Sequence, residues 1–153
     1  MSNENTPKIS VEAQYIKDLS FENPNAPASL AGGKKPVIDL SLDLHVVRVA
    51  EEKDVFEVIL TVEAKATSEE QSLFVVELVY SGVFTVSNVT EEERKIILGV
   101  HCPALLFPFA RSIIANVTQS GGLQPLMIDP IDFGALYHSK MMQDAAEAEK
   151  AGK

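Results

Sequence analysis

The sequence predicts an α+β fold, with antiparallel strands before residue 90 and helices after it. Between residues 37 and 87, apolar side chains occupy the even positions of three successive segments, which is the period of a strand with one buried face. From Thr90 onward the apolar residues take the spacing of a helix instead. The change of period along the chain therefore separates a sheet from a helical half.

The three predicted strands cover residues 37–46, 55–66 and 72–87, and short polar turns separate them. Such turns favour an antiparallel meander with one dry and one wet face. A short strand with Ile9, Val11, Ala13 and Tyr15 on its buried face precedes the meander. The connection between them, 21–36, is rich in proline, glycine and asparagine, and we expect no secondary structure in it.

The wet face of the predicted sheet is acidic. The odd positions of the strands include Asp39, Asp43, Glu57, Glu63 and Glu77. Apolar residues on the same side as Glu77 depart from this rule: they are Leu73, Val75, Val79 and Val83. This row is either covered by a neighbouring element or an exposed interaction surface. We also expect a bulge or a close backbone approach at Gly82.

The helical half begins with a capping box formed by Thr90 and Glu93. Pro103 predicts a kink, with Cys102 outside helical geometry, and Gly121-Gly122 ends the helix. Apolar residues point in more directions than one small sheet can cover, so we expect a second subunit on the far side. The residues predicted for this oligomer interface are Leu105, Leu106, Phe109 and Ile113.

Composition limits the classes of partner. The formal charge of −9 disfavours nucleic acid and anionic membranes. The sequence shows no secretory signal and no window that we interpret as a membrane span, so direct membrane insertion is not expected. The single cysteine fits a reducing compartment. We therefore expect a cytoplasmic protein of one domain, 8–142, with a disordered N-terminus, 1–7, and a flexible tail, 143–153, after a final helix that Asp132 caps.

Catalytic chemistry is poorly represented. His101 and Cys102 are the one adjacent His/Cys pair, but neighbours on a helix do not face each other, and we interpret Cys102 as a buried structural residue. The sequence offers no metal site, no phosphate loop and no cofactor motif that we recognise. An enzyme is not expected. A small-molecule enzyme or carrier that uses His101 or Cys102 stays as an alternative of a different class.

Three segments resemble the SecB family of bacterial export chaperones: 17–27 (KDLSFENPNAP), 99–111 (GVHCPALLFPFAR) and 123–136 (LQPLMIDPIDFGAL). The resemblance covers residues 8–142. It implies a four-stranded antiparallel sheet, one long bent helix and a short C-terminal helix, assembled as a homotetramer that is a dimer of dimers.

The resemblance also implies an activity. Members of the family bind unfolded secretory precursor proteins, keep them competent for translocation and deliver them to the export ATPase SecA, with no ATP, metal or cofactor of their own. A SecB-like chaperone dedicated to a single client, such as an antitoxin, would share these motifs and is the alternative within the family.

Two sets of site residues follow from the resemblance. The SecA-binding positions fall on Asp18, Glu22, Val75 and Glu77, with valine at 75 where the family pattern has leucine. Binding of unfolded polypeptides is assigned to the apolar connection and the final helix. The residues are Leu126, Ile128, Ile131, Phe133, Tyr137 and Met141.

Overall fold

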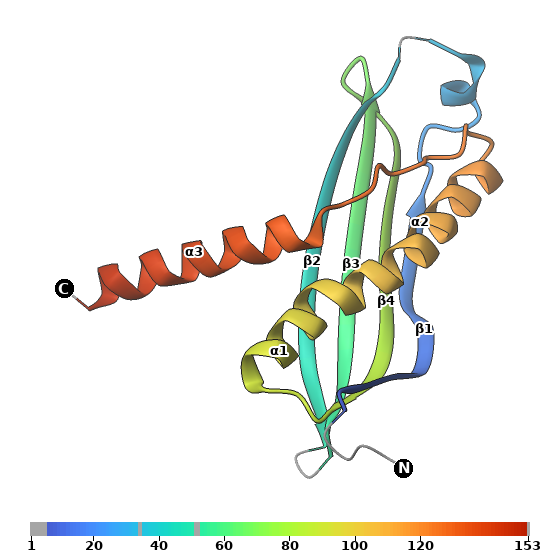
Figure 1. The fold of residues 1–153 in the computed structure, drawn as a ribbon. Helices are drawn as coiled ribbons and strands as arrows, with labels where there is room; N and C mark the ends of the chain where they lie inside the picture. The colour runs from blue at the N-terminus through green and yellow to red at the C-terminus, as the bar shows by residue number, and fades with distance from the viewer. Residues whose placement is uncertain (1–5, 34, 51–52, 153) are drawn as a thin grey trace.

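A four-stranded antiparallel sheet carries the helices on one of its faces (Figure 1). The computed structural model describes residues 6–33, 35–50 and 53–152. The strands are β1 (Lys8–Glu22), β2 (Val37–Ala50), β3 (Val55–Ser68) and β4 (Gln71–Ser87), in the order β1-β4-β3-β2. The predicted meander of three strands is confirmed, and β1 joins its β4 edge. Of the predicted N-terminal segment 1–7, residues 1–5 lie outside the described residues.

One long helical rod crosses the sheet diagonally, from the β2 side toward the end of β1 (Figure 1). It consists of α1 (Glu91–Ile96), a π-helical segment η2 (Ile97–His101) and α2 (Cys102–Ser120). The predicted capping box is confirmed: the Thr90 hydroxyl accepts from the Glu93 N–H, and the Glu93 carboxylate accepts from the Thr90 N–H, both at 3.1 Å. The chain turns out of the helix at Gly122, whose φ is +82°.

The core lies between this rod and the even positions of β3 and β4. The predicted face is confirmed: Val58, Leu60, Val62, Val76 and Leu78 are completely buried. Full burial of side chains of this size stabilises the fold by about 1.5–3 kcal/mol each. The helix approaches so closely that a Cβ at Gly82 would lie 2.9 Å from Cδ2 of Leu106. Of the two alternatives for Gly82, the close approach is therefore correct.

Strand β1 departs from the predicted alternation because it contains two bulges. Its register against β4 shifts between Val11 and Ala13 and again between Ile16 and Asp18. Each extra residue moves the following side chains to the other face. Ile9 and Val11 lie on the helix side, as predicted, but Ala13 and Tyr15 lie on the open face, so their predicted burial under the helices is wrong.

The bend predicted at Pro103 takes a different form. Cys102 is helical, with φ −66° and ψ −49°, so its predicted departure from helical geometry is wrong. Instead, its N–H bonds to the carbonyl of Ile97, five residues back, in the wider π-helical turn. This turn ends just before Pro103, a residue that has no N–H to donate. The irregularity therefore precedes the proline.

The final helix is longer than the short helix that was expected. Helix α3 covers Phe133–Ala151 and projects beyond the β2 edge of the sheet (Figure 1). Residues 143–151 continue it because they are mostly alanine, glutamate and lysine, which are good helix formers. The helix therefore continues past residue 143, where the flexible tail was predicted to begin. The long connection also contains one short helix, η1 (Ala28–Ala31).

The outward side of the rod retains exposed apolar groups. Leu105 and Phe109 are 43% and 50% exposed, whereas Leu106 is completely buried against its own sheet. The assignment of Leu106 to an oligomer interface is therefore wrong, because a second subunit could not reach it.

By length and composition alone, the rod 91–120 could cross a membrane, contrary to the sequence interpretation, but here one side of it forms the core of the domain.

Candidate functional site

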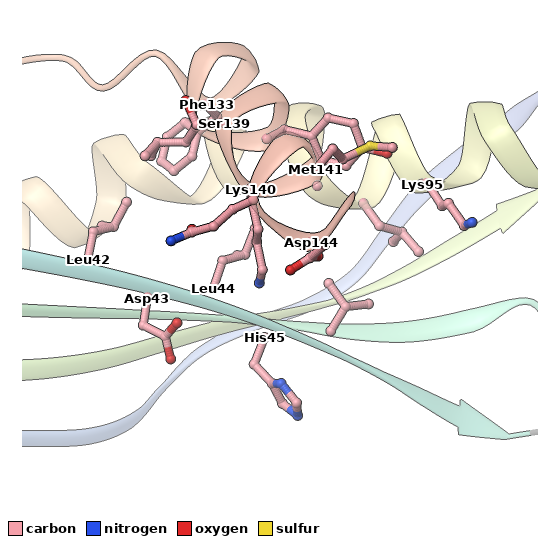
Figure 2. Close-up of a pocket in the computed structure, with 16 residues that line it drawn as sticks. Leu42, Asp43, Leu44, His45, Lys95, Phe133, Ser139, Lys140, Met141 and Asp144 are labelled. Atoms are coloured by element: carbon pink, nitrogen blue, oxygen red, sulfur yellow. The ribbon is translucent and has the colours of Figure 1, made fainter. Parts of the chain in front are cut away.

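A groove of about 720 Å³ lies between α3, the π-helical segment and the edge strand β2 (Figure 2). Leucine, aromatic and methionine side chains form most of its apolar lining: Leu42, Leu44, Leu98, Phe133, Leu136, Tyr137 and Met141. Lys95, Lys140 and Asp144 contribute charged groups. Figure 2 shows Leu42 and Leu44 on the α3 side of β2, while Asp43 and His45 extend from its other side. The groove is thus apolar in its floor and charged at its margins.

Three local contacts hold α3 over this groove. The Asp132 carboxylate accepts from the Ala135 N–H at 3.0 Å and so caps the helix. Phe133 is buried and meets Phe107 edge to face, with 6.0 Å between the ring centres. The Tyr137 ring lies on Gly99, where a Cβ would be 2.8 Å from Cδ2 of the ring. The first two turns of α3 are anchored in this way, and the rest of the helix is exposed.

Half of the residues predicted for the groove line it, namely Phe133, Tyr137 and Met141. The others lie in the connection that leads to α3 and are not among the lining residues. Ile128 is buried in the core, and Leu126 is tied to α2 because its N–H donates to the Thr118 hydroxyl at 2.9 Å. Ile131 is half-buried against the same core. Their part in polypeptide binding stays a prediction.

Leu42 and Leu44 were missed as groove residues. Their even positions had placed them in the core with the rest of β2. Because β2 is an edge strand, the helical rod does not cover it fully (Figure 1). Residues of α3 line the groove on the other side from Leu42 and Leu44. Alternation indicates which face of a strand is apolar, but it carries no signal for the place of that strand in the sheet.

The second candidate surface is the face of the sheet opposite the helices. The β1–β4 register sets Glu22 opposite Val75, Ser20 opposite Glu77 and Asp18 opposite Val79. The four predicted SecA-binding positions, distant in sequence, therefore share one face of two neighbouring strands. Within the described residues, no helix lies on this face (Figure 1).

The apolar row on this open face is half-buried by its own sheet neighbours. Leu73, Val75, Val79 and Val83 are all intermediate in exposure. Adjacent strands shield the sides of these residues, and Leu73 also packs against the buried core. In the described part of the chain, no helix lies over this face. Of the two alternatives stated above, exposure on an interaction surface fits the structure better.

Two ion pairs organise the charges of this face. The Tyr15 hydroxyl donates to the Glu57 carboxylate, and Nζ of Lys17 lies 3.0 Å from the same group. The bond from Tyr15 is the main reason that the pKa of Glu57 is lowered, and it raises the pKa of Tyr15 to about 12. On β3, Nζ of Lys65 lies 3.2 Å from Oε1 of Glu63.

His101 and Cys102 do not form a catalytic pair. The Cys102 side chain is buried in the core, and this burial raises its thiol pKa to about 12, whereas His101 is exposed. A thiol in this environment stays protonated near neutral pH and is a poor nucleophile. Within residues 6–33, 35–50 and 53–152, no group of three or more His, Cys, Asp or Glu side chains could hold a metal ion.

Comparison with known proteins gives a consistent result. The family model described as preprotein translocase subunit SecB matches residues 2–144. The protein-export protein SecB of Rickettsia bellii is 59% identical over 143 residues, and that of Rickettsia rickettsii is 58% identical. In both cases the match covers 93% of each chain.

A solved structure of a Mycobacterium tuberculosis SecB-like chaperone, in complex with a ChAD peptide from an antitoxin, shares the fold. Its TM-score is 0.65 at 16% identity, and the match covers 80% of this chain and 87% of that one. At this identity the likeness concerns the fold alone.

Proposed function

This chain belongs to the SecB family and is a protein-export chaperone, and from this premise we propose that it binds unfolded precursor proteins in the groove under α3. The observation that supports this is the apolar lining of the groove beside a sheet edge. Unfolded chains expose the apolar side chains that folding would hide, and burial of this surface yields about 25 cal/mol per Å² without demanding a sequence. Met141, flexible and 52% exposed, suits a lining that adapts to different clients.

We propose further that the open face of the sheet docks SecA through Asp18, Glu22, Val75 and Glu77. Carboxylates attract a basic partner over a distance, and the half-buried valines offer it apolar contact. Clients and SecA would then occupy opposite faces of the sheet, so that one chain can hold a client while it docks. High salt should weaken SecA docking more than client binding, because the groove is mainly apolar.

A homotetramer in the cytoplasm is the proposed form of the protein. The exposed apolar residues of α2, Leu105 and Phe109, continue onto the helix side of β1 through Ile9, Val11 and Ile16, which are 45–50% exposed. A second subunit on this surface would bury it. Several grooves on one assembly would bind a long client at several points and increase avidity by roughly 10²–10⁴.

Light scattering of the pure protein, alone and with an unfolded precursor, tests the assembly and the client together. We expect a tetramer that forms a stable complex with the precursor. A monomer that ignores unfolded chains would contradict the proposal.

For the open face, Glu77→Lys should weaken SecA docking and leave client holding intact. Lost client binding in that variant, with the tetramer preserved, would refute the assignment of this face.

A chaperone dedicated to a single client is the second candidate, because the fold is shared with a SecB-like chaperone and does not distinguish a general from a dedicated role. Binding measurements with several unrelated unfolded proteins separate the two candidates, because a dedicated chaperone would hold only one of them. The small-molecule alternative predicts an activity that depends on Cys102. We propose instead that Cys102 has a packing role only, so that Cys102→Ser leaves client holding unchanged.

A further inference from the structure

Glu63 of β3 and Glu77 of β4 are direct partners across the sheet, with both side chains on the open face. Like charges that face each other in this way repel. Lys65 relieves the repulsion from one side: its Nζ lies 3.2 Å from Glu63 Oε1, and the two side chains are 56% and 30% exposed. In the described part of the chain, Glu77 has no ion pair of its own.

Lys65 also borders the proposed docking surface. In the β3–β4 register it lies opposite Val75, as Glu22 does on the β1 side of the same valine. The apolar position is therefore flanked by a carboxylate on one side and by an ammonium group on the other. A basic partner that docks on Val75 and Glu77 must meet Lys65.

We propose that Lys65 is a specificity-determining residue of the SecA-docking surface, an inference that depends on the function proposed above. Lys65 masks Glu63 in the free chaperone. On docking, a cationic side chain of the partner takes the place of Lys65 and lies between Glu63 and Glu77, while an apolar side chain of the partner contacts Val75. The docking surface thus extends from β1 and β4 onto β3.

The fitting partner is a segment that combines basic and apolar side chains. The cation relieves the repulsion between two carboxylates, and the apolar group covers a valine that is only half-buried. Lys65 sets a minimum number of positive charges for a partner segment, because a segment with too few cationic side chains cannot displace Lys65 from Glu63. Its role is therefore discrimination as well as affinity.

The same face offers a matched control in Lys17. This residue pairs with Glu57 at 3.0 Å and also carries one positive charge on the open face. However, Glu57 keeps the hydrogen bond from Tyr15 when Lys17 is removed. The substitution Lys17→Gln therefore changes the net charge as Lys65→Gln does, without releasing a carboxylate beside Glu77.

The experiment measures the affinity of the intact protein for purified SecA at low and at physiological salt. We expect Lys65→Gln to bind about two- to fivefold more tightly than wild type, because exposed ion pairs of this kind are worth up to roughly a factor of five. Lys17→Gln should bind less than twofold more tightly. In a Glu63→Gln background, Lys65→Gln should bring no gain, since the carboxylate that it releases is gone.

Equal gains in Lys65→Gln and Lys17→Gln would overturn the inference, because they would indicate a general effect of net charge. A gain that persists without Glu63 would overturn it as well. If either of these two outcomes is seen while the wild type binds SecA and Glu77→Lys weakens that binding, only the role of Lys65 is refuted, and the proposed docking surface stands. If Glu77→Lys binds as tightly as wild type, the docking surface is elsewhere, and the proposed docking role of the open face fails together with the inference.

Discussion

The Tyr137 ring lies directly on Gly99, so that α3 packs on the π-helical segment at a residue that has no side chain. A Cβ there would approach Cδ2 and Cε2 of the ring to 2.8 and 3.1 Å, closer than ordinary van der Waals contact. This contact joins the π-helical segment to α3 and thereby sets the width of the groove. Gly99 and Tyr137 both line the groove, so a side chain added at Gly99 should shift α3 relative to the rest of the lining.

We expect Gly99→Ala to displace α3 and to weaken client holding severalfold, with little loss of global stability. Alanine favours a helical backbone over glycine by about 1 kcal/mol, which offsets part of the strain. Suppression of client aggregation and amide exchange in α3 measure the effect. Gly33→Ala is the control, since nothing lies within 4 Å of a Cβ at that position. Unchanged α3 exchange in Gly99→Ala would contradict the seating role.

Two neighbouring methionines of α3 allow the groove to be compared with the rest of the helix surface. Met141 lines the groove and Met142 does not, while their exposures are similar at 52% and 63%. We expect Met141→Ser to lower the affinity for an unfolded client by about two- to tenfold, because it removes apolar contact area. Met142→Ser should bind like the wild type. Titration of a fluorescent unfolded client measures both, and equal losses would exclude a special role of the groove.

The hydrogen bond between Tyr15 and Glu57 predicts a stability contribution with two pH limits. It lowers the pKa of Glu57 from its ordinary 4.5, so its contribution is present above that value and is lost as the pH falls through the lowered pKa. It raises the pKa of Tyr15 from 10.0 to about 12, so the contribution is present below 10 and is lost as the pH rises toward 12.

Tyr15→Phe should therefore lower the free energy of unfolding by about 1 kcal/mol between pH 5 and pH 10, discounted for partial exposure. The difference from wild type should shrink on both sides of this range. Denaturant unfolding across the pH scale provides the measurement. A difference that stays constant from pH 3 to pH 12 would show that the hydrogen bond to the ionised Glu57 is not its source.

The β3–β4 turn contains two glutamates in the left-handed region. Glu69 and Glu70 have φ values of 51° and 67°, as in the two-residue turns that favour Asn-Gly. A side chain costs about 1 kcal/mol in this conformation, so Glu70→Gly should increase the free energy of unfolding by about 0.5–1 kcal/mol. Glu70→Ala, which removes the charge but keeps the Cβ, should bring no such gain. A gain in the alanine variant would attribute the effect to charge.

Much of the fold could be predicted because apolar residues occupy every even position of β3 from Phe56 to Ala66 and nearly every even position of β4 from Phe74 to Val86. Leu60 and Leu78 lie where that pattern places them, under the helix. The bulges of β1 could not be predicted, since each moves the side chains by one position without a proline or glycine to mark it. The π-helical turn was hidden for a related reason: Pro103 signalled an irregularity but not its kind or its direction along the chain.

The site residues divide along similar lines. Phe133, Tyr137 and Met141 recur at helical spacing after an N-cap, so their common face was predictable. Leu106 was misplaced because the sequence shows which residues of a helix are apolar but not how far around the helix one sheet reaches. Leu42 and Leu44 were missed because the sequence does not show that β2 is an edge strand. The acidic docking positions came from family resemblance, and the register places them together.

The π-helical segment at 97–101 has a consequence for how this helix tolerates changes in length. A turn that closes five residues back contains one residue more than an α-helical turn. Loss of one residue there would restore an ordinary turn and leave Leu106 facing the sheet. The same loss before Ile114 in α2 would rotate every later side chain by about 100° and turn Ile114 out of the core, where it is now completely buried. The rod can therefore tolerate the loss of one residue in this segment without losing the packing of α2 on the sheet.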